Sequence, residues 1–431
     1  MKSSNPYKLP GMELIDHSFE VPLDHSRPNA RELKIFVREV RDLDPKSAEK
    51  PFLLFLQGGP GFRAPCPIKK EGWLKRALTE FRVLMYDTRG NGLSSPIDHQ
   101  TLALEGDARA QADYLKNFRA DNIVRDAEAI RSRLSPGTPW STIGQSYGGW
   151  CTLTYLSLHP EGLKECFIYG GVPGLDRTAR EIYEGTFPFV EERNRQYFEK
   201  FPMDKERLNK LARHLQENDV RLPNGDRLTP RLVQLLGLKM GFAHTAEEIH
   251  YLLEEAFVQA GEKEIVSHTF LKGMQASCRF DSNPIFAILH EAIYAQGSAT
   301  GWACDAVQKR DYPHFENFED FLFYGEMVFP WVFDEISELK GMKEAADILA
   351  AYEDWPQVYD KDVLSRNTVP TACAVYSNDM FVNVKFSKET VDFVPNMTAW
   401  YTSQYEHCGI RAGGEDMFAR LIDLARGEVE R

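Results

Sequence analysis

The sequence contains few cysteines and no long apolar segment. Seven cysteines occur among 431 residues, an odd number without a Cys-x-x-Cys pair, which favours reduced thiols over a disulfide framework. The sequence contains no run of eighteen apolar residues, the length needed to cross a membrane, and its first ten residues lack the apolar stretch of a secretion signal. These absences predict a cytoplasmic protein that does not bind membranes.

Positive charge is also scarce. The 51 lysines and arginines are outnumbered by 64 aspartates and glutamates, and the net charge of −13 argues against a partner bound through phosphates, such as DNA or RNA. Most of the excess negative charge lies in residues 241–340, which contain 17 acidic and 6 basic residues. A solvated helical face is one explanation of this acidic segment. A substrate with a cationic group is the other.

Apolar segments with strand character end in glycine-rich turns in both halves of the chain. We expect strands over 31–40, 51–57, 81–87, 371–377 and 397–403, and helices over 122–134 and 415–430. Strands that alternate with helices predict an α/β fold, with a mostly parallel sheet and helices on both of its faces.

The segment 175–345 has a different pattern. It contains long amphipathic stretches, such as residues 246–260, and little that resembles a strand. Because strand character resumes after it, we expect a helical cap inserted into the α/β part. The predicted division is a catalytic core over 1–174 and 346–431 and a helical cap over 175–345.

Residues 144–148, GQSYG, match the G-x-S-x-G pattern between a strand-like run and a helical one. A serine on such a tight turn exposes its hydroxyl, and the backbone N–H of the next residue points at a developing oxyanion. Ser146 is therefore the candidate nucleophile, and Tyr147 contributes the first oxyanion donor. A chance glycine-rich turn at a helix start is the alternative.

A serine nucleophile needs a base, and the base needs an acid that orients it. His407 follows the predicted strand 397–403, and Asp379 follows the predicted strand 371–377, so both partners come after Ser146 in the chain. Asp360 and Asp362 are rival acids, but they precede a strand instead of following it.

Residues 57–61, QGGPG, directly follow an apolar strand-like run. The backbone N–H of Gly58 or Gly59 can turn toward the same oxyanion. The pattern is not a phosphate-binding loop, because the Lys-Ser/Thr end is missing. A purely structural turn is the alternative.

Three motifs together resemble the prolyl aminopeptidase (proline iminopeptidase) family of α/β hydrolases. They are QGGPG at 57–61, YDTRGNGLS at 86–94 and GQSYGG at 144–149. The usual family motifs are H-G-G-P-G, D-Q-R-G-x-G-x-S and G-x-S-W-G-G, so Gln57, Thr88 and Tyr147 are departures, none of which removes a reacting group. The resemblance implies an α/β-hydrolase fold with an enlarged helical cap.

The resemblance also implies an activity. Family members release an N-terminal residue, typically proline, from a small peptide with a free amino terminus, through an acyl-enzyme and without a metal or other cofactor. In such enzymes glutamates of the cap bind the substrate amine. Glu291, in an E-x-x-Y pattern, and Glu326 lie among apolar and aromatic residues and are similar to these glutamates. An acid paired with a nearby arginine is the alternative for each.

Other functions remain open at this point. An esterase, an amidase or an aminopeptidase of different specificity would use the same triad and oxyanion donors. A ligand-binding protein without activity would be expected to lack part of the triad. No His-Glu-x-x-His motif or paired cysteine spacing indicates a metal. The oligomeric state does not follow from the sequence.

Overall fold

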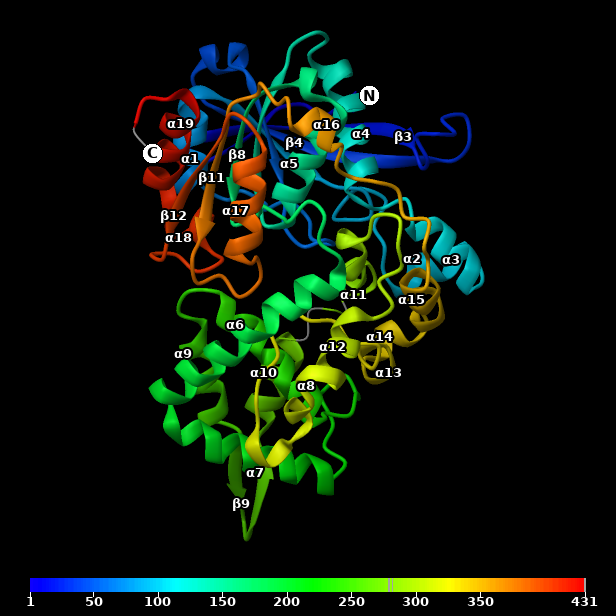
Figure 1. Cartoon of the computed structure of the whole chain (residues 1–431), viewed down its shortest axis with the longest axis vertical. Helices are drawn as coiled ribbons and strands as arrows, with labels where there is room; N and C mark the ends of the chain where they lie inside the picture. The colour runs from blue at the N-terminus through cyan, green and yellow to red at the C-terminus, as the bar shows by residue number, and fades with distance from the viewer. Residues whose placement is uncertain (278–279, 281, 430–431) are drawn as a thin grey trace.

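The computed structural model describes residues 1–277, 280 and 282–429; Cys278 and residue 430, the last of the helix predicted over 415–430, lie outside this part of the chain. Figure 1 shows an α/β part, which carries both chain ends, and below it a mostly helical part formed by the middle of the chain. The predicted α/β class is confirmed.

One mixed sheet organises the α/β part. Its order is β1-β3-β4-β6-β5-β7-β8-β11-β12, with β2 paired to β3; strands β1 to β4 are antiparallel additions, and the series from β6 to β12 runs parallel. The strands are β1 (Lys2–Ser3), β2 (Tyr7–Leu9), β3 (Met12–Pro22), β4 (Glu32–Asp42), β5 (Phe52–Leu56), β6 (Arg82–Asp87), β7 (Trp140–Gln145), β8 (Leu163–Tyr169), β11 (Thr371–Tyr376) and β12 (Met397–Thr402).

Helices cover both faces of this sheet, and the central strands are therefore buried on both sides. In β5, Leu53 and Phe55 join the apolar cluster under α1 and α19, whereas Leu54 and Leu56 join the cluster that contains α4 and α5. The helices of this part are α1 (Gly72–Glu80), α2 (His99–Leu102), α3 (Ala108–Leu115), α4 (Ala120–Leu134), α5 (Tyr147–Leu158), α16 (Lys361–Leu364), α17 (Val384–Phe393), α18 (Gly409–Ala412) and α19 (Gly414–Arg426).

The helical part begins with the long helix α6, which lies directly below the α/β part in Figure 1. Its helices are α6 (Ala179–Lys200), α7 (Pro202–Glu217), α8 (Pro230–Gln234), α9 (Thr245–Glu254), α10 (His268–Ser277), α11 (Pro284–Leu289), α12 (Ala303–Asp311), α13 (Val332–Glu335), α14 (Ser337–Lys340) and α15 (Lys343–Ala350). The predicted division into core and cap stays a prediction, and its second boundary, 345/346, falls inside α15.

Two sets of strands depart from the sequence-based expectation. The amphipathic stretch 246–260 is a helix only as far as Glu254, and β9 (Phe257–Ala260) pairs with β10 (Lys263–Val266) in an antiparallel hairpin. The hairpin is mostly exposed, so it lacks the apolar alternation by which strands are recognised. Strands β1 to β3 were also not predicted, and they add an antiparallel edge to the parallel sheet.

A buried ion pair anchors the loop after β6. The Arg89 guanidinium donates to both carboxylate oxygens of Asp126 in α4, at 2.8 and 2.6 Å, and also to the carbonyls of Leu23 and Asn117. Both side chains of the pair are fully buried. The arginine of the YDTRGNGLS motif therefore ties β6 to α4 and to the end of β3.

Replacing Arg89 by methionine is expected to lower the free energy of unfolding by about 3–5 kcal/mol, because the change leaves the Asp126 carboxylate buried without its main partner. Chemical denaturation measures this difference. Arg27→Met is the control, since Arg27 is 76% exposed and pairs with Asp24 at the surface, where such pairs contribute about 0–1 kcal/mol. Equal stability of the two variants would contradict the anchoring role of Arg89.

Candidate active site

Ser146 lies on a strained turn between β7 and α5. Its φ of 54° and ψ of −123° are unusual for a residue with a side chain, and such strain is typical of a nucleophile elbow. The turn is held by two backbone bonds, from the Ser146 N–H to the Tyr169 carbonyl at 2.9 Å and from the Gly149 N–H to the Ser146 carbonyl at 2.7 Å. The residue is 8% exposed.

His407 and Asp379 form a buried pair beyond the ends of the neighbouring strands β12 and β11. His407 Nδ1 lies 2.7 Å from Asp379 Oδ2, and Asp379 Oδ1 accepts the N–H groups of Phe381 and Val382 at 2.8 and 3.1 Å. His407 Nε2 has no hydrogen-bond partner within the described residues. This nitrogen is therefore free to accept the proton of a serine hydroxyl.

The electrostatic surroundings of His407 favour its protonated form. Burial alone would lower the pKa of His407, but the charge and the hydrogen bond of Asp379 raise it more, and Glu326 adds to the rise. An imidazolium that forms during catalysis would thus be stabilised. The rival Asp360 has another role, since its carboxylate accepts the Val363 N–H and caps α16.

Two glycines after β8 bring the serine and the histidine together. A Cβ on Gly171 would overlap the Ser146 carbonyl oxygen, and a Cβ on Gly170 would lie 3.3 Å from His407 Nδ1. Ser146 and His407 therefore lie on two sides of the same glycine pair, although no hydrogen bond joins the two side chains in the part of the chain described. Such contacts are often long in unliganded enzymes. Sequence analysis missed the role of Gly170 and Gly171. The feature that could have revealed it is the position of two glycines directly after a strand.

The loop after β5 lies against the serine turn. A Cβ on Gly58 would be 2.9 Å from the Ser146 Cβ, so only glycine allows this close approach. The N–H of Tyr147 is the first of helix α5, and it has no carbonyl to bond within that helix. Gly58 and Tyr147 therefore lie next to Ser146, and the role of Gly58, Gly59 and Tyr147 as oxyanion donors stays a prediction.

Asp87 connects two of the three family motifs. Its carboxylate accepts the Ala64 N–H at 2.9 Å, just after the glycine loop, and the Leu93 N–H at 3.0 Å. Burial raises the pKa of Asp87 and these two hydrogen bonds oppose the rise. The aspartate of YDTRGNGLS therefore stabilises the loop that carries the candidate oxyanion donors.

Glu291 is a buried helix cap. Its two carboxylate oxygens accept the N–H groups of Ala303 and Cys304, at 2.9 and 2.8 Å, at the start of α12. Burial raises the pKa of Glu291 to about 7, although these hydrogen bonds act against the rise. Its hydrogen-bond partners are two backbone amides and the Thr300 side chain, not an arginine, and contact with a substrate amine stays a prediction.

Glu326 has a different environment. It lies in the segment between η7 (Phe318–Asp320) and α13, and its carboxylate has no hydrogen-bond or ion-pair partner in the described part of the chain. Burial raises the pKa of Glu326 to about 7; the charge of His407 lowers it and that of Asp379 raises it. The carboxyl group therefore lies within electrostatic range of both catalytic candidates.

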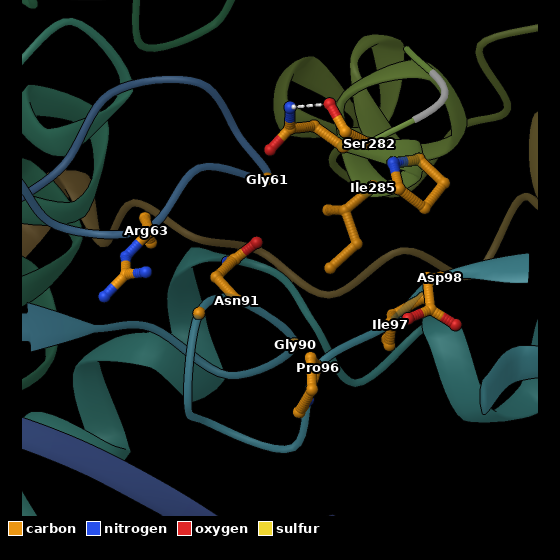
Figure 2. A pocket seen from close by; sticks show the side chains of 12 residues that line it. Gly61, Arg63, Gly90, Asn91, Pro96, Ile97, Asp98, Ser282 and Ile285 are labelled. Atoms are coloured by element: carbon orange, nitrogen blue, oxygen red, sulfur yellow. Dashed lines mark hydrogen bonds between the residues drawn. The ribbon is translucent and has the colours of Figure 1, made fainter. Parts of the chain in front are cut away.

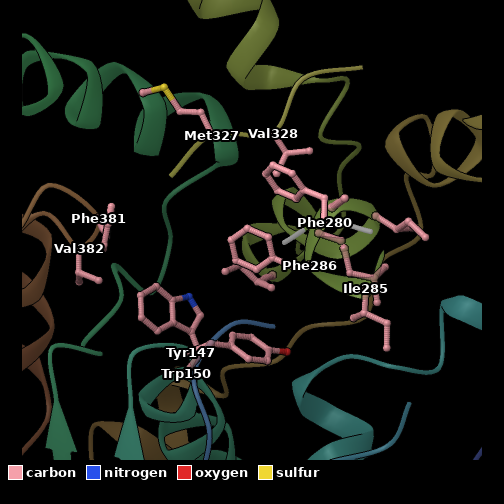
Figure 3. Packing of buried hydrophobic residues seen from close by; sticks show 14 of the residues in the cluster. Tyr147, Trp150, Phe280, Ile285, Phe286, Met327, Val328, Phe381 and Val382 are labelled. Atoms are coloured by element: carbon pink, nitrogen blue, oxygen red, sulfur yellow. The ribbon is translucent and has the colours of Figure 1, made fainter. Parts of the chain in front are cut away.

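Apolar side chains of the two parts meet beside the serine turn, as Figure 3 shows. The core contributes Tyr147, Trp150, Phe381 and Val382, and the helical part contributes Phe280, Ile285, Phe286, Met327 and Val328. All are buried. The serine turn is therefore flanked by apolar side chains from both parts.

A cavity of about 240 Å³ lies beside Gly61, at the end of the glycine loop 57–61. Figure 2 shows Gly61 and Asn91 of the α/β part facing Ile285 of the helical part across it, with Asp98 at its edge. The cavity lies where the α/β part and the helical part meet.

Within the described residues, no group of three or more His, Cys, Asp or Glu could hold a metal ion, and no helix is both long and apolar enough to span a membrane.

Comparison with known families agrees with this geometry. A model of the alpha/beta hydrolase fold matches residues 51–265, which include the glycine loop and the serine turn. The parallel sheet flanked by helices has the same architecture. The fold and the site thus define an α/β hydrolase, as the motifs predicted.

Full-length relatives identify the family. The proline iminopeptidase of Aeromonas sobria is 49% identical over 99% of this chain and 100% of its own length. Proline iminopeptidase aneH of Aspergillus aculeatus is 35% identical over 96% of this chain and 93% of its own. The chain belongs to the proline iminopeptidase family, and the resemblance seen in its motifs is confirmed. A solved proline iminopeptidase from Mycobacterium smegmatis covers 95% of this chain and 98% of its own at 14% identity and a TM-score of 0.46, too distant to support further argument.

Proposed function

We propose that this enzyme is a serine aminopeptidase that releases an N-terminal residue, in the first place proline, from small peptides. The observation that carries the proposal is the 49% identity to a named proline iminopeptidase over the full length of both chains. The buried His407–Asp379 pair beside the strained Ser146 supports the serine mechanism. The odd cysteine count supports action in the cytoplasm.

The proposed reaction proceeds through an acyl-enzyme. Ser146 Oγ attacks the carbonyl carbon of the first residue while His407 Nε2 accepts the hydroxyl proton and Asp379 stabilises the imidazolium. The N–H groups of Tyr147 and of Gly58 or Gly59 bind the oxyanion. Collapse of this intermediate breaks the peptide bond, and His407 returns its proton to the leaving amine. Water then attacks the acyl-enzyme by the same route and releases the free amino acid.

We assign substrate recognition to the predicted cap, residues 175–345, and catalysis to the predicted core, residues 1–174 and 346–431. Glu326 is the principal candidate for the substrate ammonium group, because its carboxylate is unpartnered and lies within electrostatic range of His407 and Asp379. Glu291 is the second candidate; its oxygens already accept two amides. The apolar side chains drawn in Figure 3 would enclose a pyrrolidine ring.

Replacing Glu326 by glutamine is expected to lower kcat/KM for a chromogenic prolyl amide by about 10- to 100-fold, because the substrate ammonium loses a charged acceptor. Its pKa of about 7 means that the carboxylate forms as pH rises through 7, so kcat/KM for free-amine substrates should rise over that range. The part of this rise that comes from Glu326 should be lost in the variant, which keeps only the rise due to deprotonation of His407. Steady-state kinetics between pH 5 and pH 9 measures both effects.

The matched control for this experiment is Glu319→Gln, because Glu319 is an exposed acid of η7, shortly before the segment of Glu326. N-acetyl-prolyl amide and a simple acyl ester test the free amine from the substrate side. Rapid ester hydrolysis, together with equal rates for substrates with and without a free amine, would support the triad and would contradict the aminopeptidase proposal. An unchanged rate in Glu326→Gln would instead move amine recognition to Glu291.

A further inference from the structure

One arginine of the helical part contacts both loops that carry the catalytic candidates. Arg193, in α6, donates from Nη1 to Glu406 Oε1 and from Nη2 to the Asn378 carbonyl, both at 2.9 Å. Glu406 directly precedes His407, and Asn378 directly precedes Asp379. A single guanidinium thus links a cap helix to the two loops that carry the buried pair.

The loop of His407 has further contacts with the same side of the molecule. The His407 N–H donates to the carbonyl of Gly241, the last residue of η4 (Leu235–Gly241), at 2.9 Å. The rings of Phe242 and His407 lie 6.0 Å apart, and the Ala243 N–H donates to Cys408 Sγ at 3.5 Å. The catalytic histidine is therefore supported by cap residues as well as by its own strand.

The geometry of this link makes it sensitive to how the cap lies on the core. The Arg193 side chain is 16% exposed, and its two bonds use separate nitrogens of one planar group, so both loops are placed relative to one rigid frame. Proton transfer from Ser146 depends on the position of His407 Nε2 to within fractions of an ångström. A small displacement of α6 would move both loops at once.

We propose that Arg193 is a positioning residue through which the docked cap makes the His407–Asp379 pair competent for catalysis. The docked cap holds the loops of the base and its orienting acid through the two bonds of Arg193. The inference rests on the proposed serine mechanism. It assigns to α6 a part in the chemistry that is distinct from substrate recognition.

The test compares Arg193→Gln and Arg193→Lys with a control on the same helix, Arg195→Gln. Arg195 is 55% exposed and pairs only with Glu192 and Glu199 of α6 within the described residues. Arg193→Gln should lower kcat for a prolyl amide by about 10- to 100-fold with KM changed less than about threefold. Arg193→Lys should recover part of the loss, because lysine retains the positive charge but lacks the planar group with two separate donor nitrogens. Arg195→Gln should match the wild type.

The pH profile separates positioning from a merely structural role. A looser contact between Asp379 and His407 removes part of what raises the pKa of His407, so the acidic limb of kcat should shift to lower pH in Arg193→Gln. Glu406→Gln should produce the same shift, and the double variant should show less than the sum of the two losses. An unchanged pH limb in both single variants would overturn the proposal.

Labelling of Ser146 by a fluorophosphonate tests the inference without a peptide, because phosphonylation needs the base but no substrate amine. Slower labelling of Arg193→Gln than of Arg195→Gln is the expected result, and equal labelling rates would overturn the inference. Failure of the wild type on prolyl amides, together with rapid labelling, would refute only the proposed substrate. Should Arg193→Gln not fold, Glu406→Gln and Arg193→Lys decide by the same measurement.

Discussion

Replacing Ser146 by alanine is expected to lower kcat for a prolyl amide by on the order of 10⁵- to 10⁶-fold, because no acyl-enzyme can form without the hydroxyl. The oxyanion donors and the cap would remain, so a small residual rate above the uncatalysed reaction is expected. Steady-state kinetics on a chromogenic prolyl amide measures the loss. Mass spectrometry after fluorophosphonate treatment should show one adduct in the wild type and none in the variant.

Ser157→Ala is the matched control for this experiment. Ser157 is buried in α5, the helix that begins directly after Ser146, and its hydroxyl has no partner in the described residues. Its replacement should leave kcat unchanged. A Ser146→Ala enzyme that retains more than about one percent of the wild-type rate would place the nucleophile elsewhere.

Replacing Asp379 by asparagine is expected to lower kcat by about 10⁴-fold, because an amide favours the wrong tautomer of His407 and cannot stabilise its imidazolium. The pH dependence should change as well. Asp379 raises the pKa of His407 against the lowering effect of burial, so its loss lowers that pKa. Since the base must be neutral to act, the acidic limb of the remaining activity should move to lower pH.

Asp360→Asn distinguishes the two candidate acids. Asp360 caps α16, and its replacement should change stability by about 1 kcal/mol or less and leave kcat near the wild-type value. Urea unfolding and steady-state kinetics on the two variants complete the comparison. Collapse of activity in Asp360→Asn with normal rates in Asp379→Asn would reverse the assignment.

The elements that the sequence predicted are those with a strong local pattern. The strands over 81–87 and 371–377 are runs of apolar residues bounded by polar turns, and they appear as β6 and β11 within a residue of the expected ends. The helix predicted over 122–134 appears as α4, which begins two residues earlier, at Ala120. The hairpin β9–β10 escaped prediction because its side chains are mostly exposed and leave no periodic pattern.

The candidate site was accessible to sequence analysis for a related reason. Ser146, Asp379 and His407 each follow a strand, and the carboxyl ends of parallel strands meet at one edge of a sheet. Strand order alone therefore brought these residues into one neighbourhood. Their roles remain predictions until the variants described above are measured.

Sequence alone determined the fold class, the family and the candidate triad of this protein, because each depends on short segments whose chemistry is readable within a few residues. Tertiary structure alone decided that Glu291 caps a helix, that Glu326 lies unpartnered within electrostatic range of His407, and that Arg193 joins the cap to the loops of His407 and Asp379. Arg193 and Glu406 are 213 residues apart in the chain. No local pattern encodes the Arg193 contacts, because they arise only when the cap packs on the core.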